Sequence, residues 1–232
     1  MPVVIIACKV MQSMLEHLLP DELRQRSVFM DYGLHRVPGN MTRELQDAID
    51  DLKDPSLVVL GYGLCGNGLQ GILTGQHTLL IPKVDDCIAI LLGSRQAYIR
   101  EFTAVPGTYY LSKGWLESGS HPLKEYEEYA EKYGAEEAAW IMDQQYRHYD
   151  RLAMVAHSQS DLDKYRPQAL EVARYCEQWG MCYEEILGSD RYVRRLLEII
   201  EQPDKSDDEF IIVPPGSKIR QEMFWDFQMV EN

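Results

Sequence analysis

Three of the five cysteines occupy matching positions along the chain, each at or beyond the end of an apolar segment. Cys8 ends the run VVIIAC, Cys65 follows SLVVL, and Cys87 follows TLLIP. Continuous apolar runs of this length are typical of strands that are buried on both faces of a parallel sheet. The carboxyl ends of such strands form the crevice in which open sheets bind ligands. If the three strands are neighbours, we expect the three thiols to meet at this edge.

Three converging thiolates are suitable ligands for zinc or for a [4Fe–4S] cluster. A metal held by three thiolates keeps one position open, which a substrate, water or a fourth residue can fill. His35, in the segment GLHRVP, is the first candidate for this fourth ligand, and His77 is the second. Because the chain has no compact CxxC pair, the alternative that each thiol is simply a small core residue stays open. We interpret Cys176 and Cys182 as structural.

A glycine-rich segment, GYGLCGNG, surrounds Cys65. Glycine allows unusual backbone angles and close approach to a ligand, so we predict that a bound group lies against a small set of backbone positions: Gly61, Gly63, Gly66 and Asn67. The segment also fits the GxGxxG pattern of dinucleotide sites. However, the next strand is followed by Pro82 and Lys83 and lacks the expected acidic residue. Dinucleotide binding is therefore the weaker interpretation.

Asp85 and Asp86 immediately precede Cys87. Asp86 is a candidate catalytic residue, as a general base or as a group that orients a ligand. The structural alternative for both carboxylates is that they stabilise the start of a helix through its dipole. We favour that alternative for Asp85 and leave it open for Asp86.

Alternating strand and helix signals are expected to position these residues. We predict strands at 3–7, 27–30, 56–60, 78–81 and 108–111, and helices at 11–19, 42–52, 69–74 and 85–92. From 121 to 175 the chain is acidic and rich in Tyr, Glu and Ala with helical spacing, which predicts two or three long helices that include Leu152. A strand at 182–187, a helix at 191–200 and a strand at 210–213 follow.

This order predicts an α/β fold with a Rossmann-like, mostly parallel sheet and a helical insertion, or alternatively two small αβ lobes. The expected divisions are an αβ lobe at 1–120 that carries the three cysteines, a helical insertion at 121–175, and a returning αβ lobe at 176–232 that completes the fold.

The composition excludes several classes of partner. The chain has 23 basic and 37 acidic side chains and a net charge of −14, which argues against nucleic acid because phosphate binding needs clustered Lys and Arg. No segment reaches the roughly 20 apolar residues of a membrane span, and the first apolar run is too short for a signal peptide. We therefore expect a cytoplasmic protein. Five cysteines in such a chain argue against a disulfide framework, and a homo-oligomer remains open.

Four segments, GLHRVPGNMTRELQDAID, GYGLCGNGLQGI, IPKVDDCIAILLGSRQAY and PGTYYLSKGW, resemble the domain of unknown function 1638 family. His35, Cys65, Asp86 and Cys87 lie in these motifs. The resemblance implies that the chain comes from an anaerobic bacterium or a methanogenic archaeon. It also implies that its gene lies near genes for corrinoid proteins and methylamine-type methyltransferases. It thereby implies a link to anaerobic one-carbon metabolism, without a settled activity.

Three functions follow as hypotheses. The first is a metal-binding protein in corrinoid-linked methyl transfer, such as a zinc-dependent methyltransferase, because zinc keeps a bound thiol nucleophilic. The second is an iron–sulfur protein with an open coordination site for redox or small-molecule chemistry. The third is a non-enzymatic partner that docks a corrinoid protein through its acidic helical region. The expected partners are a small-molecule substrate or a corrinoid protein, with the corrinoid supplied only by that protein.

Overall fold

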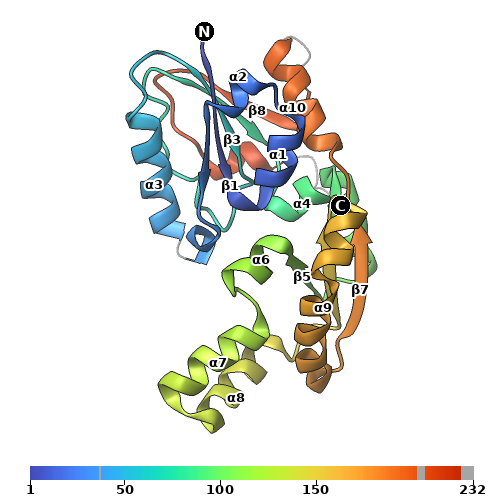
Figure 1. Cartoon of the computed structure of the whole chain (residues 1–232). Helices are drawn as coiled ribbons and strands as arrows, with labels where there is room; N and C mark the ends of the chain where they lie inside the picture. The colour runs from blue at the N-terminus through green and yellow to red at the C-terminus, as the bar shows by residue number, and fades with distance from the viewer. Residues whose placement is uncertain (37, 203–206, 226–232) are drawn as a thin grey trace, which may run out of the picture. The chain divides into compact units, whose positions relative to one another are not determined.

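The computed structural model describes residues 1–36, 38–202 and 207–225, of which 35, 36 and 38 are described by their backbone alone. The chain forms two compact units (Figure 1). The first unit comprises Met1–Arg95 and Asp190–Asn232, and the second comprises Gln96–Ser189. The sequence pattern predicts that the parts of the chain divide after residues 120 and 175. The units instead divide after Arg95 and Ser189, because the strand at 108–112 pairs within the second unit.

The first unit contains a five-stranded sheet in the order β2-β1-β3-β4-β8. Its strands are β1 (Val3–Cys8), β2 (Ser27–Met30), β3 (Leu57–Gly61), β4 (Thr78–Pro82) and β8 (Phe210–Val213). The pairs from β2 to β4 are parallel, and β8 joins β4 as an antiparallel edge strand. In this register Ala7 lies opposite Gly61, and Val59 lies opposite Leu80. The three strands that precede the cysteines are therefore neighbours, in the order β1-β3-β4.

Helices cover both faces of this sheet. They are α1 (Gln12–Leu18), α2 (Asp21–Arg24), α3 (Pro38–Asp50), α4 (Cys87–Leu92) and α10 (Arg191–Glu201), with the 3-10 turns η1 (Lys9–Met11), η2 (Tyr32–Arg36) and η5 (Gln221–Phe224). Met41, Leu45 and Ile49 of α3 pack against a buried strand face that includes Ile6 and Leu60. The opposite face is covered by α1 and α10 (Figure 1). Residues of one strand alternate between these two faces.

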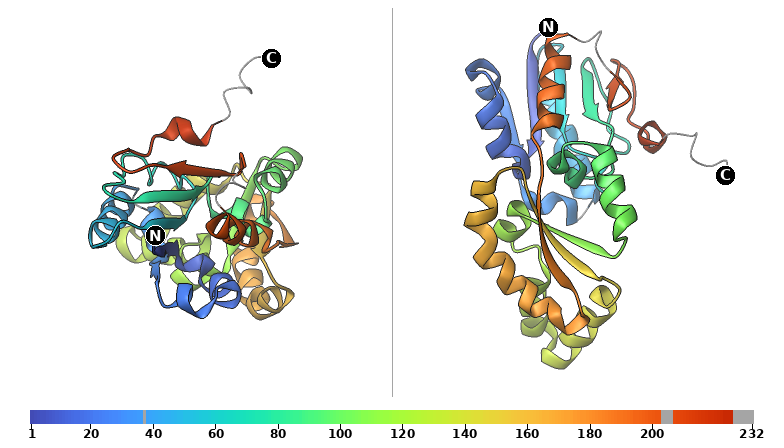
Figure 2. Two further views of the ribbon diagram at one scale, coloured as in Figure 1. Left: turned by 90° about the horizontal axis from the view of Figure 1, so that it is seen from above. Right: turned by 90° about the vertical axis from the view of Figure 1, so that its right-hand side faces the viewer.

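The second unit contains a parallel three-stranded sheet in the order β5-β6-β7. Its strands are β5 (Thr108–Ser112), β6 (Arg151–Ala156) and β7 (Cys182–Leu187). Its helices are α5 (Arg95–Ala104), α6 (Lys113–Ser118), α7 (Pro122–Tyr133), α8 (Ala135–Tyr146) and α9 (Gln159–Cys176), with the 3-10 turn η3 (Glu177–Trp179). α5 begins at the last residue of the first unit. α9 lies along the sheet, and Leu162 and Val172 pack in one core with Leu152 and Met154 (Figure 2). The buried Arg151 pairs with Glu101 and Glu184.

The α/β class and the mostly parallel, Rossmann-like sheet are confirmed. Two local predictions are wrong. Leu152 lies in the buried strand β6 and not in a long helix, since a short apolar run buried on both faces has no period that separates strand from helix. The expected helix at 69–74 is a series of turns, and Leu73 forms a bridge with Lys218. Among the described residues, no helix has the length and apolar character needed to cross a bilayer.

The pairing of β1 with β3 predicts a strict size limit at Gly61. A Cβ atom there would lie 2.5 Å from the Cβ of Ala7. Gly61→Ala is expected to lower the free energy of unfolding by about 1–3 kcal/mol, as overpacking does in well-packed cores. Denaturant unfolding measures this change. Gly39→Ala is the control, because a Cβ there meets nothing within 4 Å. Equal midpoints for Gly61→Ala and the unmodified chain would contradict the close packing.

Candidate functional site

Three cysteines lie at the carboxyl edge of the first sheet. Cys8 is the last residue of β1, Cys65 lies in the loop after β3, and Cys87 is the first residue of α4, which follows β4. All three are free thiols and partly buried. They lie within range of one another's charge, because Cys8 raises the pKa of Cys65, and both raise the pKa of Cys87. The three cysteines singled out in the sequence thus lie at the same edge of the sheet, and their convergence on one metal ion stays a prediction.

Two loops hold Cys65 and Cys87 near each other. Leu64 N–H donates to the carbonyl of Val84 at 2.9 Å, and Cys65 N–H donates to the carbonyl of Asp85 at 2.8 Å. The loops approach so closely that a Cβ on Gly63 would lie 2.7 Å from the backbone nitrogen of Asp86. Glycine is therefore required at this position for steric reasons.

The backbone around Cys65 is left-handed. Cys65 has a φ of 48°, and Gly66 and Asn67 follow at 62° and 71°. A residue with a Cβ adopts this region at a cost of about 1–3 kcal/mol, and such strain tends to occur at functional sites. Gly63 thus allows the close approach of two loops, and Gly66 allows the turn, whereas a bound group against these backbone positions stays a prediction.

Burial is the main influence on the thiols. It raises the pKa of Cys8 to about 11, and it raises the pKa values of Cys65 and Cys87 well above the usual range. Backbone N–H groups act in the other direction: that of Val10 lowers the pKa of Cys8, and those of Gly63 and Cys87 lower that of Cys65. Burial prevails, so the metal-free site holds neutral thiols at neutral pH.

Tyr62 is the residue of this site that the sequence interpretation missed. Its side chain is 3% exposed. Burial raises its pKa most, followed by the charges of Cys8, Cys65 and Cys87, which places the hydroxyl within range of all three. Within the described residues, the Oη atom has no hydrogen-bond partner. Its position between Gly61 and Gly63 was the available sequence signal.

Asp86 is the N-cap of α4. Its Oδ1 atom accepts a hydrogen bond from Ile88 N–H at 2.8 Å. Burial raises its pKa to about 6, which leaves it close to the range of a general base at neutral pH. The helix cap is the role that the geometry supplies, and the role as a base stays a prediction.

Of the two histidine candidates for the fourth ligand, only His77 has a described side chain. The side chain of His35 lies outside the described residues. His77 is buried, and its Nδ1 atom accepts a hydrogen bond from Ser56 N–H at 3.3 Å. Since Ser56 precedes β3 and His77 precedes β4, His77 belongs to the amino edge of the sheet, opposite to the cysteines. Among the described side chains, no group of three or more His, Cys, Asp or Glu is already arranged to hold a metal ion.

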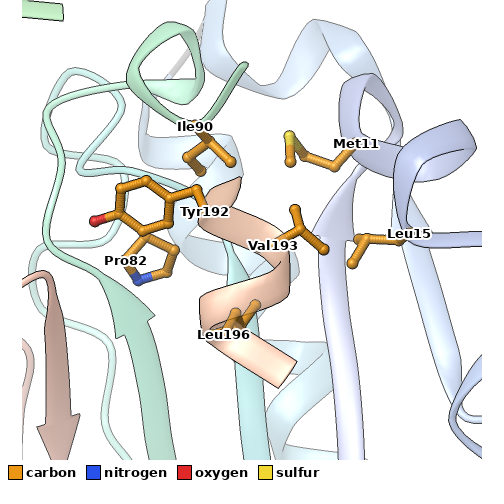
Figure 3. A pocket seen from close by; sticks show the side chains of 8 residues that line it. Met11, Leu15, Pro82, Ile90, Tyr192, Val193 and Leu196 are labelled. Atoms are coloured by element: carbon orange, nitrogen blue, oxygen red, sulfur yellow. The ribbon is translucent and has the colours of Figure 1, made fainter. Parts of the chain in front are cut away.

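A small apolar pocket lies on the other face of the sheet, between α1, α4 and α10 (Figure 3). Its cavity volume is about 10 Å³, and it is lined by Met11, Leu15, Gly61, Pro82, Ile90, Tyr192, Val193 and Leu196. The hydroxyl of Tyr192 donates to the carbonyl of Glu209 at 2.6 Å. Gly61 faces this pocket, whereas the next residue, Tyr62, packs with the α3 side. The pocket therefore contains none of the three cysteines.

Comparison with known proteins finds one family. The model of a family described as "Protein of unknown function (DUF1638)" matches residues 29–197. Cys65 and Cys87 lie inside this range, and Cys8 precedes it. No curated protein matches the chain, and no solved structure matches it.

The raised pKa of Asp86 predicts a pH-dependent stability of the metal-free protein. Asp86 has a pKa of about 6 in the folded state, above its usual value of 3.8, so the folded state retains its proton and stability falls as pH rises between these values. Asp86→Asn keeps a good N-cap and removes the ionisation. At pH 7 it is expected to raise the free energy of unfolding by about 1–3 kcal/mol. Urea unfolding at a series of pH values measures the difference, and a constant difference from pH 4 to 7 would contradict it.

Proposed function

The chain belongs to the DUF1638 family, and we propose that it is a metal-binding protein whose ligands are the thiolates of Cys8, Cys65 and Cys87. A zinc ion is the first candidate for the bound group, and a [4Fe–4S] cluster is the alternative. We further propose that the site acts in corrinoid-linked one-carbon metabolism, either as a metal-dependent methyltransferase or as an accessory to one.

The observation that supports the proposal is the position of the three cysteines, each at or after the carboxyl end of one of three neighbouring strands. Residues far apart in the sequence reach one edge of the sheet, where the charge of Cys8 acts on Cys65 and the charges of Cys8 and Cys65 act on Cys87. Close backbone contact at Gly63 and a left-handed conformation at Cys65 maintain this arrangement. A set of unrelated core cysteines requires neither feature.

The donor chemistry fits a soft cation. Burial is the main cause of the raised pKa values of the three thiols, and the charges of Asp86 and of neighbouring cysteines add to it at Cys65 and Cys87. A bound metal reverses this balance, because a coordinating thiol loses its proton outright. The three protons pass to solvent, so metal affinity should rise with pH. Since the described side chains do not already surround a common point, the proposal includes a change of cysteine rotamers on binding.

Three protein ligands leave a position for a substrate. Zinc in such a site holds a substrate thiol as a nucleophilic thiolate at neutral pH. This chain would contribute the apolar surroundings, the backbone N–H groups near Cys65, and Asp86, within reach of its charge, as a candidate proton acceptor. The assignment to one-carbon metabolism is supported by the sequence motifs around Cys65 and Cys87 that resemble the family.

Metal analysis of the anaerobically purified protein tests the proposal. We expect either about one zinc ion per chain in a colourless protein or about four iron atoms per chain in a brown one. Zinc added to the metal-free chain should release about three protons. Cys65→Ser is expected to lower metal content at least tenfold, because it removes one of the three ligands.

Cys182→Ser is the matched control, since Cys182 is exposed and lies in the second unit. It should leave metal content unchanged. Neither zinc nor iron at near-stoichiometric level, together with equal metal content in Cys65→Ser and Cys182→Ser, would refute the metal site.

A further inference from the structure

The hydroxyl of Tyr62 is a buried donor without an acceptor. Its side chain is 3% exposed, and the Oη atom makes no hydrogen bond with the described residues. Buried polar groups are nearly always hydrogen-bonded in folded proteins, so an exception needs a physical explanation. The residue cannot be dismissed as a surface tyrosine with a solvated hydroxyl.

The position of Tyr62 is fixed by its neighbours. Gly61 packs directly against Ala7, and Gly63 packs against the backbone of Asp86. The Tyr62 ring belongs to the core cluster on the α3 side of the sheet, which Cys8 and Cys65 border. The Tyr62 side chain thus belongs to the same packed cluster as Cys8 and Cys65.

A metal-bound cysteine sulfur is a stronger hydrogen-bond acceptor than a free thiol. A neutral thiol sulfur is a weak acceptor, whereas a thiolate accepts a short, charge-assisted hydrogen bond. The Tyr62 hydroxyl makes no hydrogen bond with any described residue, including the three cysteines. Metal binding converts them into thiolates and creates the missing acceptor.

We propose that Tyr62 is a positioning residue of the metal site, and that its hydroxyl donates a hydrogen bond to one of the ligand thiolates when metal is bound. This inference rests on the proposed function. The bond would orient the sulfur and spread its charge, as groups that contact metal ligands do in other sites. No bond is made or broken in Tyr62 itself, because the phenol keeps its proton.

Tyr62→Phe in the full chain tests the proposal, with Co²⁺ as the probe and its thiolate charge-transfer absorption as the signal. Two shifts of opposite sign are expected. Metal-free Tyr62→Phe should unfold at a temperature about 2–4 °C higher, because it loses an unmatched buried hydroxyl. Its affinity for Co²⁺, and for Zn²⁺ in competition, should fall about 10–100-fold with unchanged stoichiometry.

Tyr192→Phe is the matched control. Its hydroxyl is hydrogen-bonded to Glu209, and its ring lines the pocket on the opposite face. This variant should unfold at a lower temperature and bind Co²⁺ as the unmodified chain does.

The outcomes separate the two proposals. If the unmodified chain binds one Co²⁺ through thiolates and Tyr62→Phe binds it equally well, the role of Tyr62 is overturned and the metal site stands. A loss of metal-free stability in Tyr62→Phe would likewise overturn it, because the residue would then be merely structural. If the unmodified chain binds neither Co²⁺ nor Zn²⁺ and takes up no cluster on reconstitution with iron and sulfide, the metal site fails and the role of Tyr62 falls with it.

Discussion

The close approach of two loops at the carboxyl edge of the first sheet is the constraint on which the candidate site depends. Gly63 lies directly against the backbone of Asp86, and two hydrogen bonds from Leu64 and Cys65 join the loops. This contact leaves Cys65 in a left-handed conformation that most residues avoid. It also places the thiol within range of Cys87, at the start of the helix that Asp86 caps.

At this edge of the sheet, the apolar surroundings of the thiols disfavour the charged thiolate form. The apolar core that α3 forms with the sheet extends to Cys8, Cys65 and Tyr62. Such surroundings favour neutral thiols, and they leave the Tyr62 hydroxyl without an acceptor. One change, the replacement of three thiol protons by a cation, would remove both conflicts. The same physical account therefore connects the raised pKa values with the unmatched hydroxyl.

The second unit is stabilised by its own core and by its own buried charge. Arg151 begins the central strand and pairs with Glu101 and Glu184, while its Nε atom donates to the hydroxyl of Thr108. This network joins α5, β5, β6 and β7 around one guanidinium group. A buried arginine without these partners would be strongly destabilising. The charged residues in the strands of this unit therefore have a structural role.

The sequence alone determined the α/β class, the positions of β1, β3 and β4, and the placement of three cysteines after strands. Those features are local, because apolar runs and glycine-rich turns bias the backbone within a few residues. Tertiary structure alone decided that these strands are neighbours, that β5 and β6 belong to a second sheet, and that Tyr62 is buried in the core cluster that Cys8 and Cys65 border. Strand order depends on contacts between distant segments, such as Gly61 against Ala7, and local sequence patterns do not contain that information.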